Sequence, residues 1–212
     1  ALAKKFTSTE FIKKLKAIKK MGWIPSHRQG NDGGVGNTLE DLLGIKENNI
    51  PLADWGDYEL KTQRKNTTSL TTLFHLDPEP RKPKSIVANL LLPNYAWPHK
   101  EAGKKYPVGE LSFRATLGWI CTDRGFCVKV DRVQKKVFIS FNSKKVGSRH
   151  SIWLNGVESK VGLLEINPQP YWSFDSLKLK LKRKLHNMFY IVAENKGEKG
   201  DEEFLYTDAW VL

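Results

Sequence analysis

The stretch from Asp57 to Thr62 alternates charged and apolar side chains, and this alternation is the feature that most limits how the chain can fold. A repeat of two residues is typical of a half-buried strand, because successive side chains point to opposite faces. Glu59 and Lys61 should therefore share one face, opposite to the apolar side chains beside them. Such a pair is either a functional acid and base or an ordinary salt-linked pair on a strand surface.

Two helices are expected before this strand. A capping box and a stop glycine predict a first helix within residues 7–22. The run 29–36 is too rich in glycine for the interior of an element, so the second helix is expected over Thr38–Leu43. Glu40 and Asp41 would then lie in its first turns, where the helix dipole by itself accounts for carboxylates.

The pattern in the rest of the chain predicts several strands. Strands are expected over residues 70–76, 126–130, 136–141, 152–157 and 189–193. Ser173 should cap a helix whose apolar residues, from Leu177 to Met188, recur at helical spacing. We interpret its basic segment 178–184 as the solvated face of a core-packing helix; a DNA-facing helix and a membrane-surface segment are the alternatives.

Charge indicates the class of partner. Lys and Arg total 35 against 23 Asp and Glu, which gives a formal charge of +12 and favours nucleic acid. An anionic membrane would attract the same charge, yet no run approaches the roughly 18 apolar residues of a spanning helix. Residues 1–5 lack the apolar core of a signal peptide, and two cysteines make no disulfide framework. We therefore expect a cytoplasmic protein that binds DNA and no membrane.

Asp54, Glu59 and Lys61 form a pattern suited to metal-dependent phosphodiester hydrolysis. Mg²⁺ prefers hard oxygen ligands and keeps several waters, so two carboxylates and a phosphate oxygen suffice to hold it. A lysine on the same face can orient or deprotonate the attacking water. A bare Glu-x-Lys triplet is also common by chance, and on geometry alone Asp57 could replace Asp54.

Four segments together resemble the MvaI/BcnI restriction endonucleases, a family related to the mismatch-repair nicking nuclease MutH. The first two are the acidic helix with the strand motif, and the others lie further along the chain. They are Gly36-Asn37-Thr38-Leu39-Glu40-Asp41-Leu42-Leu43, Asp54-Trp55-Gly56-Asp57-Tyr58-Glu59-Leu60-Lys61-Thr62, Ser69-Leu70-Thr71-Thr72-Leu73-Phe74 and Tyr171-Trp172-Ser173-Phe174-Asp175-Ser176-Leu177. Their order and approximate spacing cover most of the chain.

The resemblance implies an α/β fold of the PD-(D/E)xK restriction-endonuclease type, a mixed sheet flanked by helices, with an added β-rich segment. It implies Asp54 and Glu59 as metal ligands, Lys61 as the catalytic lysine and Glu40 as a further acidic member of the site. We expect a monomeric, Mg²⁺-dependent type II enzyme that cleaves double-stranded DNA at a short sequence. The alternatives are a MutH-like strand-nicking repair enzyme and a non-catalytic basic DNA-binding module.

The whole chain, 1–212, is expected to form a single nuclease domain, and its length leaves open a small β-rich lobe around residues 106–165. Basic side chains in loops are candidates for phosphate contacts, although a charged run is often only a solvated loop. These candidates are Arg81, Lys82, Lys84, Lys144, Lys145 and Arg149. Family members continue into a basic, histidine-containing segment that contributes to base recognition, whereas this chain ends at Leu212, so we predict no target sequence.

Overall fold

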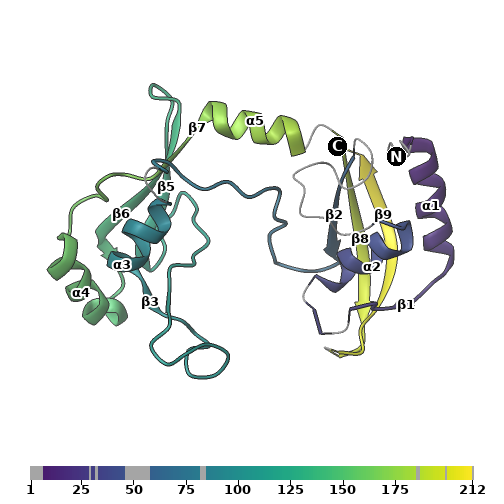
Figure 1. The fold of residues 1–212 in the computed structure, drawn as a ribbon, viewed down its shortest axis with the longest axis horizontal. Coiled ribbons are helices and arrows are strands. Elements are labelled where there is room, and N and C mark those ends of the chain that lie inside the picture. Colours follow the sequence, from purple (N-terminus) through teal and green to yellow (C-terminus); the bar gives the residue numbers. More distant parts are fainter. Residues whose placement is uncertain are drawn as a thin grey trace. The chain divides into compact units, whose positions relative to one another are not determined.

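The chain folds into two compact units (Figure 1). Unit 1 consists of residues 1–75 and 179–212, and unit 2 consists of residues 76–178. The computed structural model describes residues 7–28, 30–31, 33–45, 58–81, 85–184, 187–198 and 200–211. Within these ranges, no helix has both the length and the apolar character that a membrane crossing requires.

Unit 1 is built on a mixed four-stranded sheet. Its strands, in spatial order, are β1 (Ile24–Pro25), β9 (Glu203–Val211), β8 (Met188–Lys196) and β2 (Glu59–Arg64). Strand β2 runs parallel to β8, whereas the other neighbours are antiparallel. The strand expected over residues 57–62 is confirmed for 59–62, which lie in β2, whereas Asp57 lies outside the described residues. The strand expected over 189–193 is confirmed as part of β8, and the mixed sheet with its helices confirms the expected α/β class.

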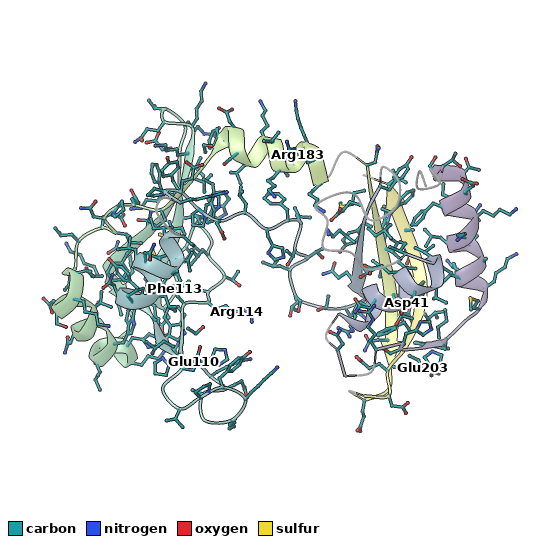
Figure 2. All side chains as sticks on the ribbon, in the orientation of Figure 1. Asp41, Glu110, Phe113, Arg114, Arg183 and Glu203 are labelled. Carbon is teal, nitrogen blue, oxygen red and sulfur yellow. The ribbon has the colours of Figure 1, made fainter. Side chains whose placement is uncertain are left out.

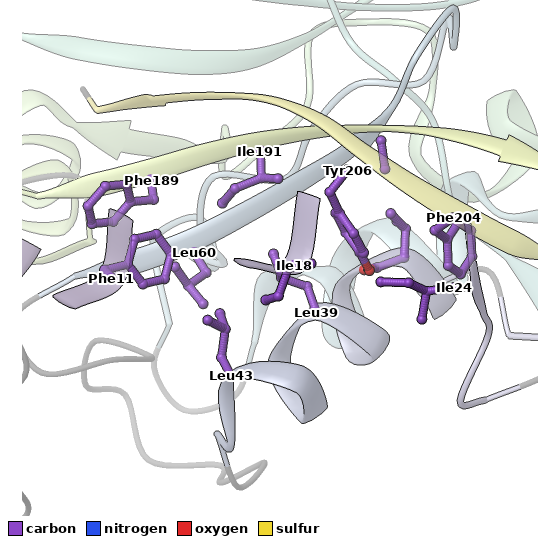
Figure 3. Packing of buried hydrophobic residues seen from close by; sticks show 12 residues of the cluster. Phe11, Ile18, Ile24, Leu39, Leu43, Leu60, Phe189, Ile191, Phe204 and Tyr206 are labelled. Carbon is purple, nitrogen blue, oxygen red and sulfur yellow. The ribbon is translucent and has the colours of Figure 1, made fainter. Parts of the chain in front are cut away.

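Helices α1 (Ser8–Lys20) and α2 (Gly34–Leu43) pack on one face of this sheet. The predicted capping box of α1 is present, because Thr7 accepts from the Glu10 amide and Glu10 accepts from the Thr7 amide. Apolar side chains of both helices meet those of β2, β8 and β9 in the core of unit 1 (Figure 3). This core contains Phe11, Ile18, Leu39, Leu43, Leu60, Phe189, Ile191, Phe204 and Tyr206.

Helix α2 begins at Gly34, four residues before the expected start at Thr38. A side chain at Gly34 would come within 3.1 Å of Ser26 Oγ, and one at Gly36 would come within 3.0 Å of Thr62 Oγ1. These glycines therefore allow α2 to pack closely against its neighbours. The expectation that the glycine-rich run lies outside any element was wrong for its last three residues, 34–36, because close packing offsets the roughly 1 kcal/mol cost of glycine in a helix.

Unit 2 is centred on a three-stranded antiparallel sheet with the order β5 (Arg124–Asp131), β6 (Lys136–Val146) and β7 (Tyr171–Ser173). The expected hairpin over 126–141 is confirmed by β5 and β6. A two-stranded sheet joins β3 (Trp97–Pro98) to β4 (Leu111–Ser112). The helical segments are η1 (Val87–Leu91), α3 (Leu92–Tyr95), η2 (Ser148–His150) and α4 (Ser151–Val161).

Two expected strands are absent. Residues 152–157 lie in α4, where Trp153, Leu154 and Val157 pack inward at helical spacing while Ile152 is exposed. Residues 70–76 form neither strand nor helix, and Leu70 is 80% exposed. Both predictions were wrong because an apolar run by itself does not reveal whether a strand partner is present.

Helix α5 (Phe174–Lys184) crosses the boundary between the units. The Ser173 hydroxyl accepts from the Ser176 amide at 3.1 Å, which confirms the predicted cap. The helix does not continue to Met188, which is already part of β8. No residue of α5 is fully buried, and Leu179 is 51% exposed. The interpretation of this segment as a core-packing helix was therefore wrong.

Candidate active site

Strand β2 presents two faces of different character. Leu60 is buried beside Phe189 of β8, in the core covered by α1 and α2. Glu59 and Lys61 lie on the opposite face, as the alternation predicted, and Lys61 is level with Tyr190 of β8. Among the described strands, β2 is at the end of the order, so one of its edges has no neighbouring strand. The acid and the base are thus fixed by the backbone of an edge strand.

The Glu59 carboxylate is nearly buried and is held by two ammonium groups. Its side chain is 5% exposed. Lys61 Nζ donates to Glu59 Oε1 at 2.6 Å, and Lys184 Nζ donates to Glu59 Oε2 at 3.1 Å. A carboxylate at this depth requires such charged partners, because desolvation alone would strongly disfavour its ionised form.

Lys184 is the residue of this site that the sequence did not reveal. It is the last residue of α5 and lies 125 positions from Glu59 in the sequence. The basic run 178–184 was recognisable, but nothing in it separates Lys184 from its neighbours. Figure 2 shows the exposed Arg183 at the same end of the helix.

Glu40 lies in the C-terminal half of α2, not in the first turns, because the helix begins at Gly34. A carboxylate near a helix C-terminus is disfavoured by the dipole, so the dipole does not account for Glu40. The neighbouring Asp41, labelled in Figure 2, has a structural explanation. His27 Nδ1 lies 3.3 Å and Arg28 Nη2 lies 3.9 Å from its carboxylate oxygens.

The side of α2 that carries Glu40 faces β2. Gly36 and Glu40 are one turn apart and share a helix face, and Gly36 approaches Thr62. Burial first, and then the carboxylates of Asp41 and Glu40, raise the pKa of Tyr206. Glu40 thus belongs to the helix that packs beside β2, on the face of the strand opposite to Glu59.

A cleft of about 710 Å³ in unit 1 opens where α2 meets the edge of β2. Lys61 and Arg64 contribute cations to its wall, and Gly33 and Gly36 contribute the start of α2. Segment 67–72 also lines the cleft, mainly with hydroxyl side chains. Gln63 Nε2 fixes this segment by donating to the Ser69 carbonyl at 2.9 Å. Ammonium, guanidinium and hydroxyl donors are the groups that contact phosphate oxygens in protein–DNA complexes.

Only part of the expected metal site lies within the described residues. Asp54 and its geometric alternative Asp57 fall outside them. In the described ranges, no group of three or more His, Cys, Asp or Glu side chains is placed to hold a metal ion. Glu59 fits a hard divalent cation by its donor chemistry, since it offers carboxylate oxygens, and Lys61, which contacts one of them, lines the cleft.

Comparison with known proteins identifies the family. The family model described as "MvaI/BcnI restriction endonuclease family" matches residues 12–212. The chain belongs to the MvaI/BcnI restriction endonuclease family. Membership makes it a type II restriction endonuclease, a site-specific deoxyribonuclease that acts on DNA. The predicted family and enzyme class are confirmed, and the alternative of a non-catalytic DNA-binding module is excluded.

One solved structure agrees with the fold of an MvaI/BcnI family member. The structure of restriction endonuclease MvaI in complex with its cognate DNA substrate superimposes with a TM-score of 0.74 and 24% sequence identity, covering 97% of this chain and 75% of that chain. MvaI in the absence of DNA gives a TM-score of 0.43 at 24% identity, covering 95% and 79%. No curated protein matches the chain. Restriction endonucleases of this kind generally use divalent metal ions.

The basic residues expected to contact phosphates all belong to unit 2 of this restriction endonuclease. Lys82 and Lys84 lie outside the described residues. Arg81 is exposed, and its guanidinium donates to the Asp77 carbonyl at 2.9 Å. Exposed Lys144 and Lys145 lie in strand β6, not in a loop as expected, because β6 continues to Val146.

Arg149 is exposed on the short helix η2 and is paired with Asp123. The hydrogen bond from Arg149 is the largest of several interactions that lower the pKa of the Asp123 carboxyl. His150 Nε2 also lies 2.9 Å from Asp123. A phosphate that bound Arg149 would therefore compete with the Asp123 carboxylate for its guanidinium.

Proposed function

We propose that this restriction endonuclease hydrolyses phosphodiester bonds of double-stranded DNA at a short specific sequence, with Mg²⁺ as its cation. In this proposal Asp54 and Glu59 are the metal ligands, Lys61 is the catalytic lysine and Glu40 is a further acid of the site. The observation that carries the proposal is the nearly buried Glu59 carboxylate, which Lys61 contacts at 2.6 Å beside an open cleft.

The described side chains have clear parts in such a reaction. Strand β2 fixes the backbone position from which Glu59 presents its carboxylate to a cation. Lys61 lies in the wall of the cleft, where its ammonium can orient the attacking water and stabilise charge that develops on the phosphate. A bound Mg²⁺ would polarise the phosphate and lower the pKa of a bound water.

Glu40 is included because the ordinary explanation for an acid on this helix does not apply. Its position in the C-terminal half of α2 removes the helix dipole as a reason for its charge. The face of α2 that it shares with Gly36 is turned toward β2. We propose that Glu40 reaches the metal around the edge of β2, directly or through a bound water.

DNA contacts are assigned to the basic side chains of unit 2. Arg81, Lys144 and Lys145 are exposed and suited to phosphate contacts, and we also assign Lys82, Lys84 and Arg149 to this role. We propose that residues 1–212 act together as one nuclease domain, with the β-rich lobe suggested around residues 106–165 inside unit 2. We further propose that the enzyme acts as a monomer in the cytoplasm.

The test is cleavage measured together with binding. Asp54→Ala and Glu59→Ala should each abolish cleavage of a substrate plasmid while leaving DNA affinity largely intact, because removing a ligand unseats the cation rather than the phosphate contacts. Asp57→Ala is the comparison variant and should remain active. Cleavage retained by Glu59→Ala would overturn the site assignment. If Asp54→Ala stays active and Asp57→Ala is inactive, Asp57 rather than Asp54 is the metal ligand.

The same plasmid assay separates two modes of action. A type II enzyme that cuts both strands converts supercoiled plasmid into linear product, whereas a MutH-like nicking enzyme stops at the open circular form. Sequencing the ends of the cleaved DNA gives the recognition sequence and the cut position. Cleavage of unrelated sites at equal rates would contradict the proposed sequence specificity.

A further inference from the structure

Glu59 is shared by two lysines that reach it from unconnected elements of unit 1. Lys61 lies two residues further along β2, and Lys184 is the C-terminal residue of α5. Each lysine contacts a different oxygen of the carboxylate. Both lysine side chains are 20% exposed, so each ammonium is partly withdrawn from water.

The two ammonium groups differ in how firmly the fold holds them. Lys61 is part of a strand that pairs residue by residue with β8, and its Nζ is 2.6 Å from the carboxylate. Lys184 is at the end of a helix with no fully buried residue, and its Nζ is 3.1 Å away. Of the two contacts, that of Lys184 is the longer, and it comes from a helix end rather than from a paired strand.

A cation that bound Glu59 would meet the positive charge of Lys184 at the same carboxylate. Mg²⁺ binds carboxylate oxygen at about 2.0–2.1 Å, which is closer than an ammonium can approach. An ammonium that stayed in place would lie within about 4–5 Å of the dication and would repel it. The ammonium and the cation are therefore each attracted to the Glu59 carboxylate, but they repel each other when both are bound there.

We infer that Lys184 is a positioning residue of this active site: its ammonium holds Glu59 Oε2 and competes there with the incoming divalent cation. The inference rests on the proposed role of Glu59 as a metal ligand. Lys184 holds the carboxylate in its orientation, and cation binding replaces one positive partner by another. The lysine thereby sets the concentration of divalent cation at which the site fills, while Lys61 remains on the other oxygen.

The test is the affinity for a divalent cation, measured by calorimetry on the full chain after treatment with EDTA. Mg²⁺ and Ca²⁺ serve as probes, without DNA. Lys184→Met should bind the cation roughly ten- to thirtyfold more tightly than the wild type, because one repelling charge near 4 Å has been removed. Lys184→Arg retains the charge and should bind as weakly as the wild type. Lys182→Met removes an exposed charge from the same helix and should change the affinity little.

A structural role for Lys184 would give a different pattern. Loss of the contact would lower the melting temperature of Lys184→Met in EDTA without raising its cation affinity. Unchanged or weaker cation binding by a folded Lys184→Met would overturn the inference. Glu59→Gln tests the ligand role of Glu59 separately from the role of Lys184. This variant should lose cation binding. If it binds the cation as the wild type does, the proposed ligand role of Glu59 fails instead.

Discussion

Glu59 in unit 1 and Glu165 in unit 2 are two carboxylates held in opposite ways. Glu59, with a side chain 5% exposed, is contacted by the ammonium groups of Lys61 and Lys184. Glu165, with a side chain 38% exposed, accepts from the Phe141 amide at 2.7 Å. It also accepts from the Ser140 hydroxyl at 2.5 Å and the Ile166 amide at 3.1 Å, and it lies 3.3 Å from Lys129 Nζ.

The two carboxylates differ in the kind of donor that holds them. Glu165 accepts from backbone amides, whereas Lys61 and Lys184 contact Glu59 through their side chains. Backbone amides are fixed by the fold, so Glu165 Oε1, which accepts from two of them, is committed to donors that cannot move away. Burial opposes the charge of Glu165, but these hydrogen bonds outweigh it and lower its pKa. The partners of Glu59 are flexible side chains. In the proposed role of Glu59 as a metal ligand, a cation would therefore replace a side-chain partner and not a backbone hydrogen bond of the strand.

The largest effect is expected from Lys61→Met. This change removes the ammonium that can orient the attacking water, and single-turnover cleavage should slow by about 10²–10⁴-fold. Lys129→Met, which removes the corresponding ammonium beside Glu165, should leave the cleavage rate close to that of the wild type. Equal losses in the two variants would remove the distinction between the two carboxylates.

Glu40→Gln should slow cleavage at least tenfold or raise the Mg²⁺ concentration that cleavage requires. The side chain keeps its size, so the effect reports the charge. Without a catalytic role, the change should leave the cleavage rate and the Mg²⁺ requirement unchanged, and any effect should be confined to the melting temperature. Cleavage and melting temperature are measured on the same variant. Full activity at ordinary Mg²⁺ would leave Asp54, Glu59 and Lys61 as the whole site.

Glu165→Gln should weaken the fold and spare the chemistry. The loss of charge-assisted hydrogen bonds should cost about 1–3 kcal/mol, toward the lower end because the side chain is partly exposed. Since the pKa of Glu165 is lowered from its ordinary value of 4.5, the difference from the wild type should be complete above about pH 4.5 and fade as the pH falls further. Urea unfolding across this pH range measures it. A constant difference would show that ionisation is not involved.

The smallest effect is expected from the double variant Lys144→Ala with Lys145→Ala. If both side chains contact phosphates, the slope of log affinity against log salt should fall by about 0.9 for each contact. DNA affinity is measured across a salt series, and cleavage is measured at saturating enzyme. A large loss of the cleavage rate at saturation would place these lysines in the chemistry and contradict their assignment to binding.

The sequence predicted the part of the site that depends on local periodicity. Alternation along β2 was enough to place Glu59 and Lys61 on one face, and their contact follows from that spacing. The contact from Lys184 could not be predicted, because it depends on where α5 ends relative to a strand 125 residues away. Local patterns carry no information about such tertiary contacts.

The wrong predictions about the fold have the same origin. Gly34 and Gly36 looked like loop residues because their close packing against other elements is invisible in the sequence. Residues 152–157 looked like a strand because a short apolar run suits a strand and a helix equally. Capping residues, by contrast, act within four positions, and both predicted N-caps, at Thr7 and Ser173, were correct.

The most direct test of the account is to locate the cation itself. Crystals of the enzyme soaked with Mn²⁺ give an anomalous signal that marks the ion independently of any assumed ligand. We expect a peak at coordination distance, about 2.0–2.3 Å, from a carboxylate oxygen of Glu59, and none at Glu165. Mn²⁺ at Glu165, or a peak elsewhere that leaves Glu59 bound only to its lysines while Mn²⁺ supports cleavage, would contradict the account.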